Sequence, residues 1–166
     1  AMIENKFEIK NSIQTVMNNQ VIFTPETIEH DDFDDIKRAT INWLRLQTGI
    51  QDAVDLNSVA SYAMPELVKN RIQNGYFSKR SGQIYFILEP SWFDGGSTGT
   101  THGSWYSYDA HIPLVFMGWR VKPGKTNQVY HMTDIASTLA AMLRIPEPNG
   151  NIGRPITELT HQFSGL

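Results

Sequence analysis

Residues 84–88, Ile-Tyr-Phe-Ile-Leu, form a nearly continuous apolar run. Side chains of a strand alternate between its two faces, so apolar residues at successive positions indicate a strand that is buried on both sides. Residues 112–117, Ile-Pro-Leu-Val-Phe-Met, form a second run of the same kind. We predict a strand at each run, and we expect both faces of each strand to be covered.

The segment between the two runs has a very different composition. Residues 94–104, Asp-Gly-Gly-Ser-Thr-Gly-Thr-Thr-His-Gly-Ser, contain four glycines and five hydroxyl residues. Such a segment cannot form a buried core, and it predicts a loop between the two strands. Loops that a rigid sheet holds in place often carry binding and catalytic residues. His102 within this loop is therefore the first candidate functional residue.

Three segments have the spacing of apolar residues that is typical of amphipathic helices. The first begins at two aspartates, residues 31 and 32, has its apolar positions between residues 33 and 44, and is expected to stop at Gly49. The second lies within residues 58–74, and we expect it to begin near Pro65, because proline is favoured in the first turn of a helix and not in its interior. The third follows Thr133, a favourable N-cap residue, and ends at Leu143.

The remaining segments give weaker patterns. Residues 21–23 and the surroundings of Val54 predict short strands, and residues 145–155 predict an extended tail rich in proline and glycine. Residues 1–19 are poorly defined, with one helical turn expected around residues 13–17. The element order β-α-β-α-β-loop-β-α predicts an α/β chain, in detail an α+β subdomain with ferredoxin-like β-α-β elements and strands of mixed direction.

Composition excludes several classes of protein. The chain has 166 residues, which suits one domain. Its 14 basic and 17 acidic residues give a formal net charge of −3, so no basic nucleic-acid groove is expected. The absence of cysteine excludes disulfides, thiolate nucleophiles and cysteine-based zinc fingers. No apolar run approaches the roughly 18 residues of a membrane span, and residues 1–4 lack the pattern of a signal peptide.

Two short stretches could hold a metal or a proton. His102 has room around its backbone, and imidazole is a common zinc ligand; alternatively, it is a loop histidine hydrogen-bonded to a carbonyl group. Asp109 and His111 are two residues apart, so on an extended segment they point the same way. Asp109 could then orient His111 or bind a metal beside it; alternatively, it caps a turn and His111 lies at the start of the strand.

Six short motifs occur in order along the chain. They are Asn-Gly-Tyr at 74–76, Lys-Arg-Ser-Gly at 79–82, Gly-Thr-Thr-His-Gly-Ser at 99–104, Tyr-Asp-Ala-His-Ile-Pro-Leu at 108–114, Thr-Asp-Ile-Ala-Ser-Thr-Leu-Ala at 133–140, and the tail at 148–156. The series resembles the C-terminal third of the alkaline phosphatase superfamily, in particular the bacterial alkaline phosphatases related to nucleotide pyrophosphatase/phosphodiesterases. The resemblance covers residues 20–159 and leaves 1–19 as an N-terminal segment and 160–166 as a tail.

The resemblance implies a hydrolase of phosphate monoesters or diesters with two zinc ions and a threonine or serine nucleophile that becomes phosphorylated. It implies that His102 is one zinc ligand, with Thr101, Asp109 and His111 as candidates that support it. No stretch of this chain matches the nucleophile or the other ligands, which lie upstream in the family. The resemblance also implies a periplasmic or other extracytoplasmic location, and the C-terminal strand and helix of an alkaline-phosphatase-like core.

We therefore expect the chain to be a fragment of a zinc phosphatase that is inactive alone. In this fragment, one face or edge of the pair of strands 84–88 and 112–117 would lose the cover that the family's other strands provide. We therefore also expect the isolated chain to self-associate through this region, or to cover it with its own terminal segments. One alternative is a self-contained ferredoxin-like binding or interaction module without catalysis. Another is a mononuclear metal hydrolase that uses His102, Asp109 and His111.

Overall fold

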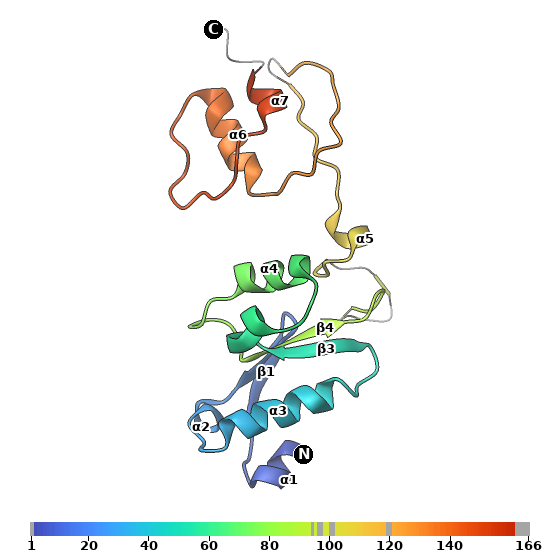
Figure 1. Cartoon of the computed structure of the whole chain (residues 1–166), viewed down its shortest axis with the longest axis vertical. Helices are drawn as coiled ribbons and strands as arrows, with labels where there is room; N and C mark the ends of the chain where they lie inside the picture. Colours follow the sequence, from blue (N-terminus) through green and yellow to red (C-terminus); the bar gives the residue numbers. More distant parts are fainter. Residues whose placement is uncertain (1, 94, 96–97, 100–101, 119–120, 162–166) are drawn as a thin grey trace. The chain divides into compact units, whose positions relative to one another are not determined.

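The computed structural model describes residues 2–93, 95, 98–99, 102–118 and 121–161 (Figure 1). The chain divides into two compact units, Ala1–Ile112 and Pro113–Leu166, each with its own packing. In the described part of the chain, no helix is both long enough and apolar enough to cross a membrane.

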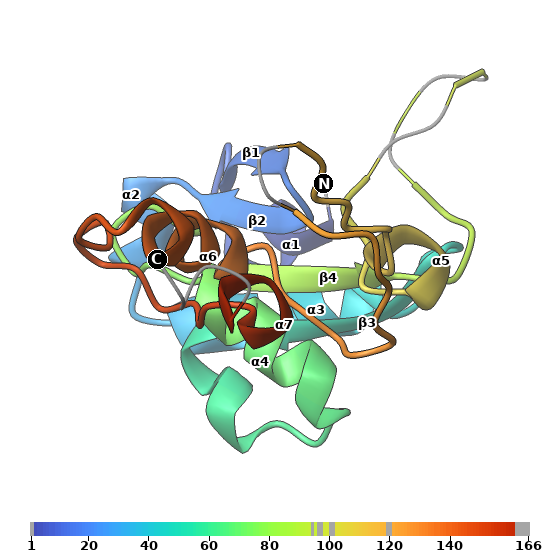
Figure 2. The same ribbon diagram turned by 90° about the horizontal axis from the view of Figure 1, so that it is seen from above.

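The first unit is built on a sheet whose described strands lie in the order β1-β2-β4-β3, as Figure 2 also shows. These strands are β1 (Ile13–Met17), β2 (Gln20–Phe23), β3 (Ile50–Asp55) and β4 (Ile84–Leu88). Both β2 and β3 pair antiparallel with β4, so they run parallel to each other with β4 between them. Together with the helix α3 (Phe33–Leu44) they form a split β-α-β unit. The α+β class with ferredoxin-like elements is therefore confirmed.

The prediction of a helical turn around residues 13–17 is wrong, because these residues form strand β1. Met17 pairs with Gln20, so Asn18 and Asn19 form a two-residue hairpin turn, and both have positive φ, 51° and 61°. Asparagine tolerates this conformation, which matches the twist of the flanking strands. All five residues of β1 are exposed, so no alternation of apolar and polar residues marks the strand in the sequence.

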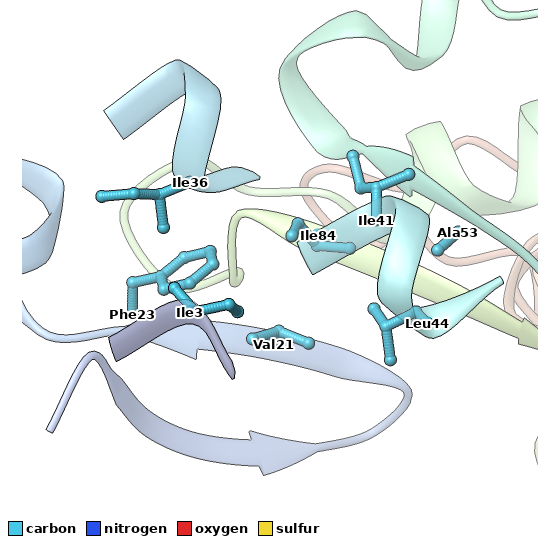
Figure 3. Packing of buried hydrophobic residues seen from close by; sticks show 8 residues of the cluster. All are labelled: Ile3, Val21, Phe23, Ile36, Ile41, Leu44, Ala53 and Ile84. Carbon is cyan, nitrogen blue, oxygen red and sulfur yellow. The ribbon is translucent and has the colours of Figure 1, made fainter. Parts of the chain in front are cut away.

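Helices cover both faces of this sheet (Figure 1). On one face, α1 (Met2–Phe7) and α3 contribute to a cluster that includes Ile36 and Ile84, both 0% exposed (Figure 3). On the other face, Ile87 packs with residues of the 3₁₀ helix η1 (Leu56–Ser61) and of α4 (Glu66–Gly75). Strand β4 thus contributes to both clusters, which confirms that the run 84–88 is buried on both sides.

The predicted helices of the first unit are also confirmed. Helix α3 lies within the predicted segment and ends at Leu44, before the expected stop at Gly49. Helix α4 begins directly after Pro65, which is its N-cap residue. A short helix, α2 (Pro25–Ile28), connects β2 to the segment before α3.

The second unit contains α6 (Asp134–Leu143) and α7 (Thr157–Thr160). Thr133 occupies the N-cap position of α6 as predicted, but its side chain makes no capping hydrogen bond. The Asp134 carboxylate accepts the backbone N–H of His131 at 2.8 Å and that of Arg154 at 2.9 Å instead. These bonds tie the tail to the start of α6.

Gly153 fits closely against the same helix start. A Cβ atom at position 153 would lie 2.0 Å from the carbonyl oxygen of Thr133. The Thr138 hydroxyl continues this contact, because it donates to the Asp134 carbonyl at 2.6 Å and accepts the Ile156 N–H at 2.9 Å. The predicted extended tail is therefore confirmed for the residues that follow α6. Its backbone N–H groups at Arg154 and Ile156 bond to the side chains of Asp134 and Thr138.

The second apolar run, residues 112–117, forms no strand. Its side chains are largely exposed: Ile112 is 55%, Val115 80% and Met117 93% exposed. A strand needs a neighbour for its backbone N–H and carbonyl groups, and the described residues include no strand paired with this run. The prediction of a strand covered on both faces is wrong for this run.

Candidate functional site

The segment that carries the candidate residues folds as a turn of helix. Helix α5 (Ser107–Ala110) includes Asp109, and His111 is its C-cap residue. The expected extended conformation of residues 109–111 is therefore wrong, and the two side chains do not point the same way along a strand. The N–H of Asp109 donates to the carbonyl of Tyr106 at 2.9 Å, which closes the turn.

Asp109 turns back toward the loop and organises it. Its Oδ2 atom accepts the backbone N–H of Ser104 at 2.7 Å and that of Gly103 at 3.1 Å. Its Oδ1 atom lies 3.2 Å from Nδ1 of His102. The Asp109 side chain is 12% exposed and the His102 side chain is 93% exposed, so a shielded carboxylate holds an accessible imidazole.

These contacts determine the charge of Asp109. The Ser104 N–H contributes most, and His102 and the Gly103 N–H act in the same direction, so the pKa of Asp109 falls from 3.8 to about 2. At neutral pH the carboxylate is ionised and can only accept hydrogen bonds. A neutral His102 therefore carries its proton on Nδ1, and Nε2 is the nitrogen with a lone pair.

Contacts with the sheet hold this segment in place. The Tyr106 hydroxyl lies 2.9 Å from the carbonyl oxygen of Leu88, at the end of β4, and 2.7 Å from Oε1 of Gln51 in β3. The Arg71 guanidinium donates to the carbonyl of Trp105 at 3.1 Å. The residues between His102 and Asp109 are thus fastened to the sheet and to α4.

An open pocket of about 500 Å³ lies beside His102 and Asp109. Aromatic side chains contribute much of its lining, among them Trp92, Phe93 and Tyr108. Burial raises the pKa of Tyr106, which also lines the pocket, so its hydroxyl keeps its proton at neutral pH. The site therefore combines one imidazole, one carboxylate and an aromatic wall.

The structure brings together only part of the predicted site. His102 and Asp109 are in contact, whereas the polar contacts of Asp109 do not include His111. Thr101 lies outside the described residues. Among those residues, no three His, Asp or Glu side chains form a group that could hold a metal ion. A metal site made of His102, Asp109 and His111 is therefore wrong for this chain as described.

Sequence reasoning missed the groups that orient Asp109. They are the N–H groups of Gly103 and Ser104. Sequence reasoning also missed the Tyr106 hydroxyl, which fastens the same segment to the carbonyl of Leu88. Every residue except proline has a backbone N–H, so a sequence does not show which of these groups bind a carboxylate. The available signal was Gly103, because its φ of 135° is unfavourable for other residues.

Known proteins share this chain's sequence and fold. No family model matches it. It is 49% identical to a Myroides odoratus protein named calcium-transporting ATPase, 45% identical to alkaline phosphatase PhoV of Synechococcus elongatus and 40% identical to alkaline phosphatase PafA of Elizabethkingia meningoseptica, each over 96% of the chain. The crystal structure of wild-type PafA matches 96% of the chain with a TM-score of 0.89 and 38% identity. The chain corresponds to the C-terminal part of an alkaline phosphatase-like protein.

This alkaline phosphatase-like chain spans only 29% to 30% of the length of the curated relatives and 31% of the solved PafA chain. The sequence identity of 38% to the solved PafA chain accompanies a TM-score of 0.89, so the two chains are similar in sequence as well as in fold. The resemblance inferred from the six motifs is confirmed.

Proposed function

We propose that the whole protein hydrolyses phosphate esters with two zinc ions, and that His102 is one of the zinc ligands. The observation that carries this proposal is the contact between Nδ1 of His102 and Oδ1 of Asp109, at 3.2 Å. Histidines that bind zinc commonly donate their second ring N–H to a carboxylate, which fixes the tautomer and the orientation of the ring. The names of PhoV and PafA as alkaline phosphatases support the reaction class.

The residues of this chain fit one side of such a site. Asp109 keeps the proton on Nδ1 and so directs Nε2 of His102 toward a metal, and the imidazole is 93% exposed. A bound zinc would neutralise phosphate charge and activate an oxygen nucleophile or leaving group. Asp109 acts as a positioning residue in this proposal, because its oxygens are engaged with His102, Gly103 and Ser104.

We propose that this chain alone is inactive. A zinc site generally needs three or four protein ligands, and the described residues contain no group of three. The threonine or serine nucleophile and the other ligands would come from the remaining part of the protein. The protein would act on phosphate esters outside the cytoplasm, as the resemblance implies.

We also propose that the isolated chain self-associates. Residues 112–117 leave Val115 and Met117 almost fully exposed, and apolar surface of this kind favours association. In the whole protein, other segments would cover this surface.

Substitution of His102 in the whole protein tests the main proposal. We expect His102→Ala to lose most of the hydrolysis of p-nitrophenyl phosphate and to bind less zinc per molecule by elemental analysis. His131→Ala is the matched control, because the contact of His131 with Asp134 is made by its backbone N–H. Full activity and zinc content in His102→Ala, or equal losses in both variants, would exclude this role.

A ferredoxin-like module without catalysis remains the competing function, and the same assay separates the two. A whole protein that binds no zinc and hydrolyses neither phosphate monoesters nor diesters would support the binding module. The 166-residue chain should hydrolyse neither kind of ester even with added zinc. Turnover by this chain that His102→Ala abolishes would contradict its proposed inactivity.

A further inference from the structure

Three large aromatic side chains lie partly exposed around the pocket beside His102. Trp92 is 47%, Phe93 44% and Tyr108 63% exposed, although each also lines this pocket. Scattered exposed aromatic residues need no explanation, but several around one pocket mark a binding surface.

The rest of the structure holds two of these rings in place. The Tyr108 ring stacks on Tyr106, with ring centres 5.6 Å apart and an angle of 9° between the planes. The hydroxyl of Tyr108 accepts the N–H of Ser91 at 2.8 Å. Trp92 lies against Gly49, where a Cβ atom would come within 2.3 Å of its ring. The aromatic wall is therefore formed before any ligand arrives.

The charge of the lining indicates what kind of group would bind. Among the described residues, those that line this pocket include no lysine or arginine, and their ionisable groups other than tyrosine hydroxyls are His102 and Asp109. The described lining therefore offers an aromatic ring more contacts than it offers a bare phosphate. Its volume of about 500 Å³ is sufficient for an aromatic ring.

We propose that this pocket binds the aromatic ring of the alcohol part of a phosphate ester, and this step rests on the proposed function. The pocket includes His102, so a phosphate group held by a metal at this imidazole would place its ester substituent beside Trp92, Phe93 and Tyr108. Stacking on these rings would stabilise a planar aromatic group more than a small alkyl group. The inferred substrates are therefore phosphate esters of aromatic alcohols.

Binding of small ligands to the 166-residue chain tests this inference without zinc or hydrolysis. NMR titrations with phenol, phenyl phosphate and methyl phosphate would follow the indole N–H signal of Trp92. We expect phenol and phenyl phosphate to shift this signal and methyl phosphate to leave it unchanged.

Matched variants locate the binding surface. Phe93→Ala should weaken phenol binding about fivefold, the effect of losing one aromatic contact, whereas Phe77→Ala should not, because Phe77 is similarly exposed at 51% and lies outside this pocket. The inference is overturned if phenol leaves the Trp92 signal unchanged, if methyl phosphate shifts it equally, or if the two variants behave alike. Failure of the zinc proposal would leave phenol binding intact, so the two failures are distinguishable.

Discussion

Nδ1 of His102 lies 3.2 Å from Oδ1 of Asp109, and this contact joins an exposed imidazole to a shielded carboxylate. The two residues are seven positions apart. Between them, the backbone N–H groups of Gly103 and Ser104 donate to the same carboxylate. Asp109 therefore fixes both the loop and the ring.

Asp109→Asn in the whole protein should lower phosphatase activity and zinc affinity about 10- to 100-fold, the usual effect of losing the carboxylate behind a metal-binding histidine. An amide keeps the size of the side chain but lacks the charge that favours the Nδ1–H tautomer. Hydrolysis of p-nitrophenyl phosphate and zinc titration measure the two effects. Asp31→Asn, which removes an exposed carboxylate before α3, should change neither. Unchanged zinc affinity in Asp109→Asn would contradict the positioning role.

The lowered pKa of Asp109 makes part of the stability of the chain depend on pH. Its folded-state pKa of about 2 lies below the unfolded value of 3.8, so ionised Asp109 stabilises the folded state above pH 3.8. This contribution is lost as the pH falls from about 4 to 2. Urea unfolding of the chain and of Asp109→Asn should therefore differ most near pH 6 and least near pH 2. A difference that grows on acidification would have the wrong sign.

Ile84→Ala should destabilise the first unit by about 2–5 kcal/mol, because it leaves a cavity at a fully buried position of the central strand β4. Ile13→Ala is the matched control, since Ile13 is 41% exposed on the edge strand β1. We expect its cost to be about 1 kcal/mol or less. Denaturant unfolding followed by circular dichroism measures the free energy of unfolding of both variants. Equal losses would show that the cluster around Ile36 and Ile84 does not depend on β4.

The isolated chain should elute as an oligomer at micromolar concentration when light scattering gives its mass. Val115→Lys should shift it toward the monomer. Val115 is 80% exposed in the single chain, and association would bury the introduced charge against a second copy. Leu46→Lys is the control, since Leu46 is 82% exposed on the other unit. A monomeric unsubstituted chain would refute self-association, and equal effects of both lysines would place it elsewhere.

The elements that the sequence predicted correctly carry their own signals. Residues 84–88 are apolar because β4 contributes to both hydrophobic clusters. Helix α4 begins where Pro65 permits it. In both cases a local property of the chain is sufficient to define the element. The exposure of His102 likewise follows from a loop too polar to be buried, whereas its role as a zinc ligand stays a proposal.

The wrong predictions concern segments whose conformation depends on distant partners. Residues 112–117 have the composition of a buried strand, but the described residues provide no strand to pair with them. β1 lacks any apolar alternation and exists because a two-residue turn folds it onto β2. Pairing of Asp109 with His111 was one of the alternatives for this stretch, and it required an extended segment. A single turn of helix directs the carboxylate to His102 and to the Gly103 and Ser104 N–H groups instead.

The close approach of Gly153 to the carbonyl of Thr133 limits how this sequence can change. Every other amino acid would place a Cβ atom 2.0 Å from that oxygen, so the tail would have to leave the start of α6. A saturation library at position 153 should retain glycine alone, although the residue bears no functional group. Glycine would then be required at position 153 because two backbones pack closely there. A survey of tolerated substitutions would have to distinguish such a position from one at which a catalytic or binding group is required.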